Sequence, residues 1–312
     1  MLLIGPLLLY LFYPYGWHAP FQRLAAYYAY HLRHEHYPVE YFRELFTGPP
    51  FPVSYPFVMS GITIPLVVLA PGVLGLAMWA VQGIAATRRA IRRMAPPPRP
   101  AIATWLIVLS VLIPPAIIAH PSVPIFGGTK HWMSMMPFFA ILAAWVIIEA
   151  ARQLTTLLPG GRVLAAVMIA VATVLPTMET ASTHPYGHTY YNELVGGHQG
   201  GARLGMPRTF WGGDARALLP ILNEKATIGA SVFTHRMNLD SFRAYQTDGL
   251  LRGDLRFAAD LRRADWALIN HQREYQDAEY KVWALTGNKR PAASLMFDGV
   301  PIVSLYALRP PR

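Results

Sequence analysis

Four long apolar runs organise the first 180 residues of the chain. They cover about residues 57–86, 101–119, 135–150 and 163–179. The first run carries no charged side chain at any position. Because an α-helix rises about 1.5 Å per residue and the hydrocarbon core of a bilayer is roughly 30 Å thick, these runs predict membrane-spanning helices. We expect the first span to bend near Pro65 or Pro71 and the second to be interrupted at Pro114–Pro115.

The segment before these runs has two parts. Residues 1–13 are apolar but reach only about 20 Å as a helix, which is short of a full span. We interpret them as a partial span, and the chain as the C-terminal part of a longer protein. Residues 14–56 form an outer loop rich in aromatic residues, His and Pro. Within this loop, the spacing of apolar and aromatic side chains over 20–36 predicts a helix that lies at the membrane surface.

After residue 180 the pattern becomes that of a soluble domain. Helices are expected at about 215–224, 239–247, 256–263 and 274–285, and strands at 227–234, 265–270, 292–297 and 300–307. Asp214 is expected to cap the first of these helices, and Asp298–Gly299 predicts a hairpin of the type I′ kind. The glycine-rich stretch 196–205 does not follow a strand, so we interpret it as a loop and not as a phosphate cradle. The fold class is therefore a polytopic α-helical membrane protein (1–180) with a C-terminal soluble α/β domain (181–312).

The charged residues give this arrangement an orientation. Only 14% of the chain is charged, against about 25% in ordinary soluble domains. Arginines gather in two loops, 87–100 and 151–162, that contain no acidic residue. Because arginine-rich loops stay in the cytoplasm, the soluble domain is expected on the outer, periplasmic or extracellular face of a plasma membrane. The same distribution assigns the net charge of +10 to membrane topology, so a nucleic-acid partner is not expected.

Most templates for hydrolytic or metal chemistry are missing. The sequence has no Cys, no HExxH and no GxSxG. The segment around the surface helix does contain His31, His34, Glu35 and His36. Positions three and four apart share a helix face, so His34 and His36 are weak candidates for a divalent-metal site. The alternative is that these side chains are polar groups at the membrane surface, and no cofactor is required by the sequence.

The outer loop at 120–134 is more informative. Lys130, His131 and Trp132 follow a Gly-Gly-Thr turn directly before an apolar run. A cation beside flexible backbone amides at the membrane surface suits a phosphate, and a lipid-linked phosphate lies at that depth. An ordinary lysine that reaches toward the headgroups beside an aromatic anchor fits the spacing equally well.

Three stretches carry a resemblance to a known family. They are FGGTKHWMSMMPFFAILAAW (126–145), WHAPFQRLAAYYAYHLRHEHYPVEYF (17–42) with PPFPVSYPFVM (49–59), and HPYGHTYYNELVGGHQGGARLGMPRTFWG (184–212). The chain resembles the C-type glycosyltransferases, particularly family 39, which includes protein O-mannosyltransferases and the lipid A aminoarabinose transferase. The resemblance implies transfer of a sugar from a polyprenyl-phosphate donor to a protein, lipid or glycan acceptor on the outer face. An acidic residue would deprotonate the acceptor while cations hold the departing phosphate.

The resemblance assigns residues only in part. Lys130 matches the lysine of the family's loop motif and is the first candidate for a contact with the donor phosphate; His131 is its neighbour. Arg23 and His31 are expected to line the same cavity. No acidic residue of this chain stands in the family's catalytic position, so the catalytic residue is unknown. The run Tyr190–Tyr191–Asn192 and Trp211 also match the family, and we interpret them as docking the soluble domain to the membrane part.

Two functions of different classes follow from the sequence. The first is a membrane glycosyltransferase, in which case the isolated chain would be inactive if its catalytic acid lies upstream. The second is a non-catalytic membrane-anchored binding or assembly protein on the same scaffold. A transporter is disfavoured, because ionisable residues would then be expected within the spans, whereas 57–86 and 101–119 contain none.

Overall fold

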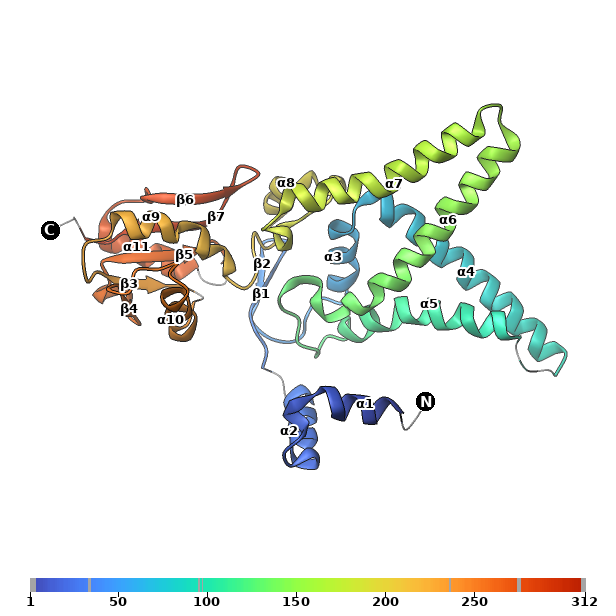
Figure 1. Cartoon of the computed structure of the whole chain (residues 1–312), viewed down its shortest axis with the longest axis horizontal. Helices are drawn as coiled ribbons and strands as arrows, with labels where there is room; N and C mark the ends of the chain where they lie inside the picture. The colour runs from blue at the N-terminus through green and yellow to red at the C-terminus, as the bar shows by residue number, and fades with distance from the viewer. Residues whose placement is uncertain are drawn as a thin grey trace. The chain divides into compact units, whose positions relative to one another are not determined.

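The structure is a computed structural model that describes residues 4–32, 35–94, 96, 98–235, 237–273 and 276–309. The chain divides into two compact units, residues 1–37 and 38–312. Figure 1 colours the chain from the N-terminus to the C-terminus. The expected boundary near residue 180 lies inside the second unit, at the end of its last long helix.

The first unit consists of short helices. They are α1 (Ile4–Phe12), the 3-10 turn η1 (Pro14–Gly16) and α2 (Pro20–Leu32). The expected partial span is thus helical over most of its length. The surface helix begins at Pro20, where proline's fixed φ suits a first helical turn, and it ends before the expected residue 36.

Four helices of the second unit are long and apolar enough to cross a membrane, among the residues that the structure describes. They are α4 (Leu66–Arg92), α5 (Arg99–Ile118), α6 (Met136–Leu157) and α7 (Gly161–Thr183). Large apolar side chains on them are exposed, for example Val81, Leu106 and Val163. Such exposure is unfavourable in water and ordinary in lipid. Each of the four expected spans thus corresponds to a helix that is long and apolar enough to cross a membrane.

The ends of these helices differ from the expected ones. The first apolar run is two helices, α3 (Tyr55–Thr63) and α4, separated at Ile64–Pro65. The first part of the expected arginine loop 87–100 is helical, because α4 continues to Arg92 and is capped at Arg93. The next helix, α5, begins at Arg99. The expected loop 151–162 shrinks in the same way to the residues between α6 and α7.

The second span is not interrupted where its prolines predicted. α5 continues through Pro114 and Pro115 and ends at Ile118. Proline's φ is compatible with a helix, and the hydrogen bonds that two prolines remove are tolerated in spanning helices more readily than in water-exposed ones. The expected interruption was therefore wrong.

Glycines bring α4 close to α6. A Cβ at Gly75 would lie 2.6 Å from the main-chain oxygen of Leu142, and a Cβ at Gly72 would collide with the ring of Phe139. Spanning helices commonly use small residues in this way, since close backbone approach maximises van der Waals contact. The core near the ends of these helices is aromatic, with Tyr55 and Trp132 fully buried.

A five-stranded sheet forms the C-terminal part of the second unit. The strands are β3 (Ser231–Thr234), β4 (Arg256–Ala258), β5 (Trp266–Asn270), β6 (Ala293–Phe297) and β7 (Val300–Ala307), in the order β4-β3-β5-β7-β6. β4, β3 and β5 are parallel, and β7 runs antiparallel to β5 and β6. The helices are α9 (Leu219–Lys225), α10 (Leu239–Thr247) and α11 (Gln276–Thr286), with 3-10 turns η5 (Gly213–Leu218) and η6 (Leu261–Arg263). The expected α/β domain is confirmed in class.

Local signals predicted this domain unevenly. The hairpin of β6 and β7 turns at Asp298–Gly299, and both residues have positive φ (48° and 72°), as a type I′ turn requires. The helix expected at 256–263 was wrong, because Arg256–Ala258 pair with β3 as an edge strand. Asp214 does not cap a helix by its side chain; it lies inside η5, which Gly212 precedes.

Two further elements were not expected. A small hairpin of β1 (Val39–Tyr41) and β2 (Glu44–Phe46) follows the first unit. The stretch 196–205, expected as a loop, contains the helix α8 (Gly197–Leu204). Its glycines serve packing: a Cβ at Gly201 would lie 2.5 Å from the Tyr191 ring. The interpretation as a loop was therefore wrong, and no phosphate cradle is needed to explain these glycines.

Candidate functional site

The candidate site is built around Lys130. This residue lies in the 3-10 turn η2 (Gly128–Met135), which leads directly into α6. Gly127 and Gly128 precede it with φ of 66° and 69°, in the left-handed region that glycine adopts without strain. A Cβ at Gly127 would lie 2.5 Å from Nε1 of Trp211. The glycines therefore permit both the turn and the close approach of the tryptophan.

Two aromatic rings hold the Lys130 side chain. Its Nζ lies 4.0 Å from the centre of the Phe126 ring and 5.5 Å from that of Trp211. Among the residues that the structure describes, no carboxylate lies within 4.0 Å of this ammonium. Aromatic faces attract the cation without neutralising it. We call Lys130, Phe126 and Trp211 the lysine–aromatic cluster.

His131 has a structural position beside this cluster. Its Nε2 lies 3.0 Å from the main-chain oxygen of Phe126, and its ring packs edge-on against the Phe126 ring at 4.6 Å between centroids. His131 thus fixes the ring that contacts Lys130. The neighbouring Trp132 is fully buried and donates from Nε1 to Ser60 Oγ at 2.8 Å. This bond anchors η2 on α3.

A buried Asp–His pair supports the same tryptophan. Asp214 has almost no exposed surface; its carboxylate accepts a hydrogen bond from the Thr209 hydroxyl and lies 3.1 Å from Nε2 of His188. The His188 ring lies 6.4 Å from the Trp211 ring. Sequence reasoning missed this pair, because Asp214 was interpreted as a helix cap and His188 was not singled out. The sequence offered no spacing signal for it, because the two residues are 26 positions apart.

Asn192 is buried, and its Nδ2 donates to the main-chain oxygens of Gly61 (2.8 Å) and Ile64 (2.7 Å). Glu193 accepts from the main-chain N–H of Leu66 at 3.3 Å. Tyr191 is buried in the same core as Tyr55 and Trp132, and its hydroxyl donates to Pro207 O, within its own segment, at 2.7 Å. These contacts correspond to the docking role that the sequence predicted for this run.

The remaining expected site residues belong to the first unit. Arg23 donates from Nη1 to Tyr15 O at 2.6 Å, and its guanidinium lies 4.7 Å from the centre of the Tyr15 ring. His31 is in α2, but its side chain lies outside the described residues, as does all of His34. The His36 side chain is exposed. Within the described part of the chain, no group of three His, Asp or Glu side chains could hold a metal ion.

A second polar cluster lies where β5 ends. The Glu279 carboxylate accepts from Tyr306 Oη at 2.8 Å and lies 3.3 Å from His271 Nδ1, while His271 Nε2 lies 2.7 Å from Ser304 Oγ. Burial and the bond to Glu279 raise the pKa of Tyr306 to about 12. For Glu279, burial would raise the pKa, but the bonds from His271 and Tyr306 outweigh it and lower the pKa. His271 and Glu279 border a pocket of about 200 Å³, and Ser304 is too buried to meet a substrate.

Comparisons with family models, with curated proteins and with solved structures find no match to this chain. The likeness to glycosyltransferases therefore depends on the three quoted stretches. The lysine–aromatic cluster contains residues from two of these stretches, 126–145 and 184–212. Its cation has no carboxylate partner among the described residues, and it lies in the turn that leads into an apolar helix.

Proposed function

We propose that this chain is part of a membrane glycosyltransferase that takes a sugar from a polyprenyl-phosphate donor, and that Lys130 contacts the donor phosphate. The observation that carries the proposal is the Lys130 ammonium, which lies against Phe126 and Trp211 with no carboxylate partner among the described residues. A lysine with a purely structural role would be stabilised by an acidic neighbour. A lysine that binds phosphate needs its charge free.

The position of Lys130 along the helices supports a lipid-linked ligand. It lies in η2, which leads into the apolar helix α6, so a phosphate on it would lie near the level where the lipid headgroups meet the hydrocarbon. The polyprenyl chain could then extend along the exposed apolar faces of the helices. A charge-assisted hydrogen bond at such a site contributes about 1.5–3 kcal/mol, which corresponds to a roughly 10-fold to 100-fold gain in affinity for the phosphate form of the lipid.

The arginines support the outer face as the side of transfer. A short connection joins the end of α4 to the start of α5, and five arginines lie on or beside it: Arg88, Arg89, Arg92, Arg93 and Arg99. Arg152 and Arg162 flank the connection of α6 to α7. Figure 1 shows both connections at the same end of the helices. Lys130 lies at the opposite end of α6. If the arginines are cytoplasmic, Lys130 and the sheet domain are periplasmic or extracellular.

The proposal leaves the general base unassigned. The acceptor is a hydroxyl of a protein, lipid or glycan, which must be deprotonated as the phosphate leaves. A non-catalytic protein that binds the same lipid would share the lysine–aromatic cluster, so the test has to separate binding from transfer.

The test is a transfer assay with the complete protein in membranes, a radiolabelled polyprenyl-phosphate sugar and a cell extract that supplies acceptors. Lys130→Ala is compared with wild type and with Lys289→Ala, a matched control whose Nζ lies 5.4 Å from the centre of the Trp283 ring. We expect Lys130→Ala to reduce transfer by about 10-fold to 100-fold, as the loss of one charge-assisted bond implies, and Lys289→Ala to retain it. Membrane insertion, followed by protease protection, should be unchanged in both. If Lys130→Ala transfers sugar at the wild-type rate, Lys130 does not belong to the site. If the wild-type protein binds the donor but transfers no sugar, the non-catalytic function is favoured.

A further inference from the structure

A pocket at the carboxyl end of β5 is not used by the proposed function. It is the pocket of about 200 Å³ that His271 and Glu279 border, and its walls also include Glu40 of β1 and Arg208 of the segment before η5. No residue of the lysine–aromatic cluster lines it. We call it the β5 pocket.

The helices that follow β3 and β5 cover opposite faces of the sheet. α10 follows β3, and its Phe242 packs in one core cluster with Leu268 of β5. α11 follows β5, and its Val282 packs in another cluster with Ile269. Because neighbouring residues of a strand point to opposite faces, the two helices lie on different sides of the sheet. In open α/β sheets, this change of side leaves a crevice at the carboxyl ends of the two strands, and ligands bind there.

Buried amides hold this end of the sheet in place. Asn270 donates from Nδ2 to the main-chain oxygen of His235 at 2.7 Å, which joins the ends of β5 and β3. Gln272 donates to Thr209 O at 2.8 Å, which holds the segment of Arg208 against the end of β5. Both amide side chains are buried. The walls are therefore fixed before a ligand arrives, which lowers the entropic cost of binding.

The β5 pocket contains charges of both signs. Arg208 and Arg273 line it, and neither has a carboxylate within 4.0 Å among the described residues. Glu279 lines it as well; its Oε1 accepts from Tyr306 and lies 3.3 Å from Nδ1 of His271. Its Oε2 accepts no hydrogen bond within the described part of the chain. One carboxylate oxygen is thus held by the protein, and the other is available to a ligand.

Glu279 is ionised and interacts with Arg208 without touching it. Burial would raise the pKa of Glu279, but the bonds from His271 and Tyr306, together with the charge of Arg208, outweigh burial and lower the pKa. At neutral pH the pocket therefore holds a carboxylate and a guanidinium that lie more than 4.0 Å apart.

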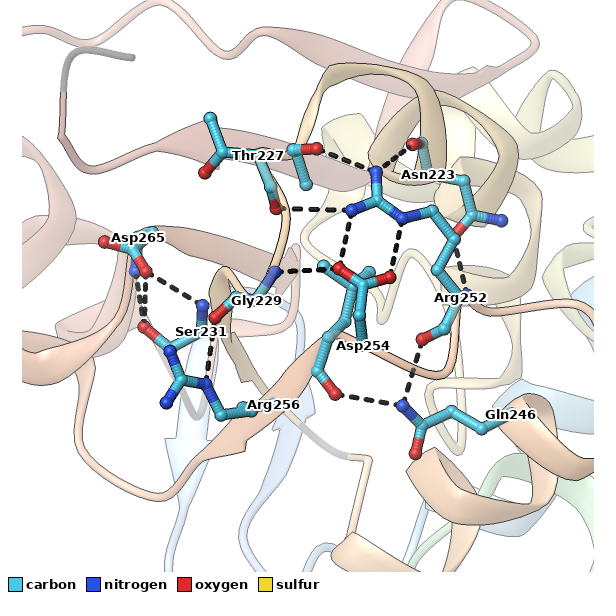
Figure 2. Close-up of polar contacts among 11 residues, drawn as sticks. Asn223, Thr227, Gly229, Ser231, Gln246, Arg252, Asp254, Arg256 and Asp265 are labelled. Carbon is cyan, nitrogen blue, oxygen red and sulfur yellow. Dashed lines mark hydrogen bonds and ion pairs between the residues drawn. The ribbon is translucent and has the colours of Figure 1, made fainter. Parts of the chain in front are cut away.

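Elsewhere in the same domain, opposite charges form direct pairs (Figure 2). The Arg252 guanidinium makes two bonds with Asp254, at 2.9 and 2.7 Å, and Asp254 also accepts from the N–H of Gly229. These groups satisfy one another at the amino end of β3. The charges of the β5 pocket stay apart, and the space between its walls can hold a ligand that contacts both.

This set of charges selects a ligand that carries both signs. An anion would be attracted by the arginines but repelled by Glu40 and Glu279, and a cation would meet the reverse. An α-amino acid has a carboxylate, which arginine binds in bidentate geometry, and an ammonium, which a carboxylate accepts. The pocket is smaller than the roughly 300–1,000 Å³ of sites for drug-sized ligands, which suits so small a molecule. The amide of Gln276 also lines it and would suit a polar side chain.

We propose that the β5 pocket binds a free α-amino acid, with its carboxylate on Arg208 and Arg273 and its ammonium on Glu279. The site binds this ligand without chemistry of its own. It does not depend on Lys130, so its failure would leave the proposed transfer function untouched.

The first measurement is thermal unfolding of the complete chain in neutral detergent, with each of the standard L-amino acids added in turn at one concentration. A ligand that binds only the folded chain raises Tm. The amino acid with the largest effect is then titrated by isothermal calorimetry. Its N-acetyl derivative, which lacks the ammonium, and its carboxamide, which lacks the carboxylate, are titrated in the same way.

Two variants remove the proposed contacts. Arg208→Gln/Arg273→Gln takes away both cations, and its matched control is Arg243→Gln/Arg290→Gln, which removes two exposed arginines outside the pocket. Glu279→Gln removes the negative charge, while its amide oxygen can still accept from Tyr306.

We expect the amino acid to bind wild type and the control alike, and both pocket variants at least about tenfold more weakly, since one charge-assisted bond is worth about that factor. Both derivatives should bind wild type more weakly by a similar factor, and this comparison holds even if a variant fails to fold. The proposal is overturned if no amino acid raises Tm or if the folded pocket variants bind as tightly as wild type. It is also overturned if either derivative binds wild type as tightly as the parent amino acid.

Discussion

Replacing Asn192 by Asp tests how the segment after α7 is held on the helices. The Asn192 amide donates to Gly61 O and Ile64 O, and its main-chain N–H donates to Ile62 O at 2.7 Å. These oxygens are at the end of α3, where helix carbonyls lack partners. Pro65 aggravates the shortage, because it has no N–H to offer Gly61 O. One buried side chain thus completes the hydrogen bonding of a helix end more than 120 positions earlier.

The magnitude follows from the chemistry of the substitution. Asp has the size of Asn, but its ionised carboxylate cannot donate the two hydrogen bonds that the Asn192 amide donates. The carboxylate would instead be repelled by the two carbonyl oxygens that it faces. Each buried acceptor left unsatisfied costs about 1–3 kcal/mol, and a buried charge without a partner about 3–5 kcal/mol in total. We expect Asn192→Asp to lose about 3–5 kcal/mol at pH 8. With an unfolding entropy of about 2.1 cal/mol/K per residue, this loss corresponds to a fall in Tm of about 5–8 °C for a chain of 312 residues.

The loss should depend on pH with a definite sign. Burial and the facing carbonyls raise the pKa of an aspartate at 192 above its ordinary value of about 3.9. A group whose pKa is raised on folding contributes stability below its unfolded pKa, and this stability is lost as the pH rises through the folded pKa. The Tm deficit of the variant should therefore be smaller at pH 4.5 than at pH 8.

The assay is thermal unfolding in detergent, followed by circular dichroism at both pH values. Asn288→Asp serves as the control, because Asn288 is exposed and its substitution is expected to change the free energy of unfolding by less than about 0.5 kcal/mol. If the Tm of Asn192→Asp lies within about 1 °C of the wild-type value at pH 8, the two segments are not attached through this amide.

Three further substitutions probe other contacts by the same unfolding assay. Gly75→Ala should lower the free energy of unfolding by about 1–3 kcal/mol, because its Cβ would lie 2.6 Å from Leu142 O. The control Gly61→Ala, whose Cβ would meet nothing within 4 Å, should not destabilise the protein. Equal effects of the two substitutions would contradict the close contact of α4 with α6. Asp214→Asn should lower Tm, because the buried carboxylate accepts a hydrogen bond from Thr209 and pairs with His188. It should also make Trp211 more mobile, which would be seen as greater quenching of tryptophan fluorescence by acrylamide. Unchanged quenching would argue against the support of Trp211 by this pair. Burial lowers the pKa of His198, so its stabilising contribution is present above the ordinary pKa of about 6.5 and is lost as the pH falls through the lowered value. The fall in Tm from pH 7.5 to 5 should thus be smaller in His198→Asn than in wild type, and identical falls would disprove it.

The sequence predicted the parts of this fold that local pattern determines. Long apolar runs predicted the four long apolar helices, and Asp298–Gly299 predicted the hairpin, because the chemistry that decides each is contained in a few neighbouring residues. A bend in the first apolar run was expected near Pro65 or Pro71; the run divides at Pro65, whereas Pro71 lies inside α4. The exact form of this break depends on Asn192 and Glu193, which no local pattern connects to it.

The errors have the same physical origin. Arg256–Ala258 became a strand because β3 offers a free edge, although their own pattern suggested a helix. In the candidate site, Lys130 was identified from its turn and its position before an apolar helix. The pairing of His188 with Asp214 could not be predicted, since the two lie on separate turns and meet only when the segment 184–214 folds back on itself.

The most direct test of the account is equilibrium binding of polyprenyl phosphate to the purified chain in detergent, measured by native mass spectrometry. Wild type is compared with Lys130→Ala and with Lys289→Ala, and the free polyprenol serves as the ligand without a phosphate. The account predicts that wild type and Lys289→Ala bind the phosphate form in preference to the alcohol, and that Lys130→Ala loses this preference. Equal preference for the phosphate in Lys130→Ala and wild type would contradict the central claim that Lys130 recognises the phosphate of a lipid-linked donor.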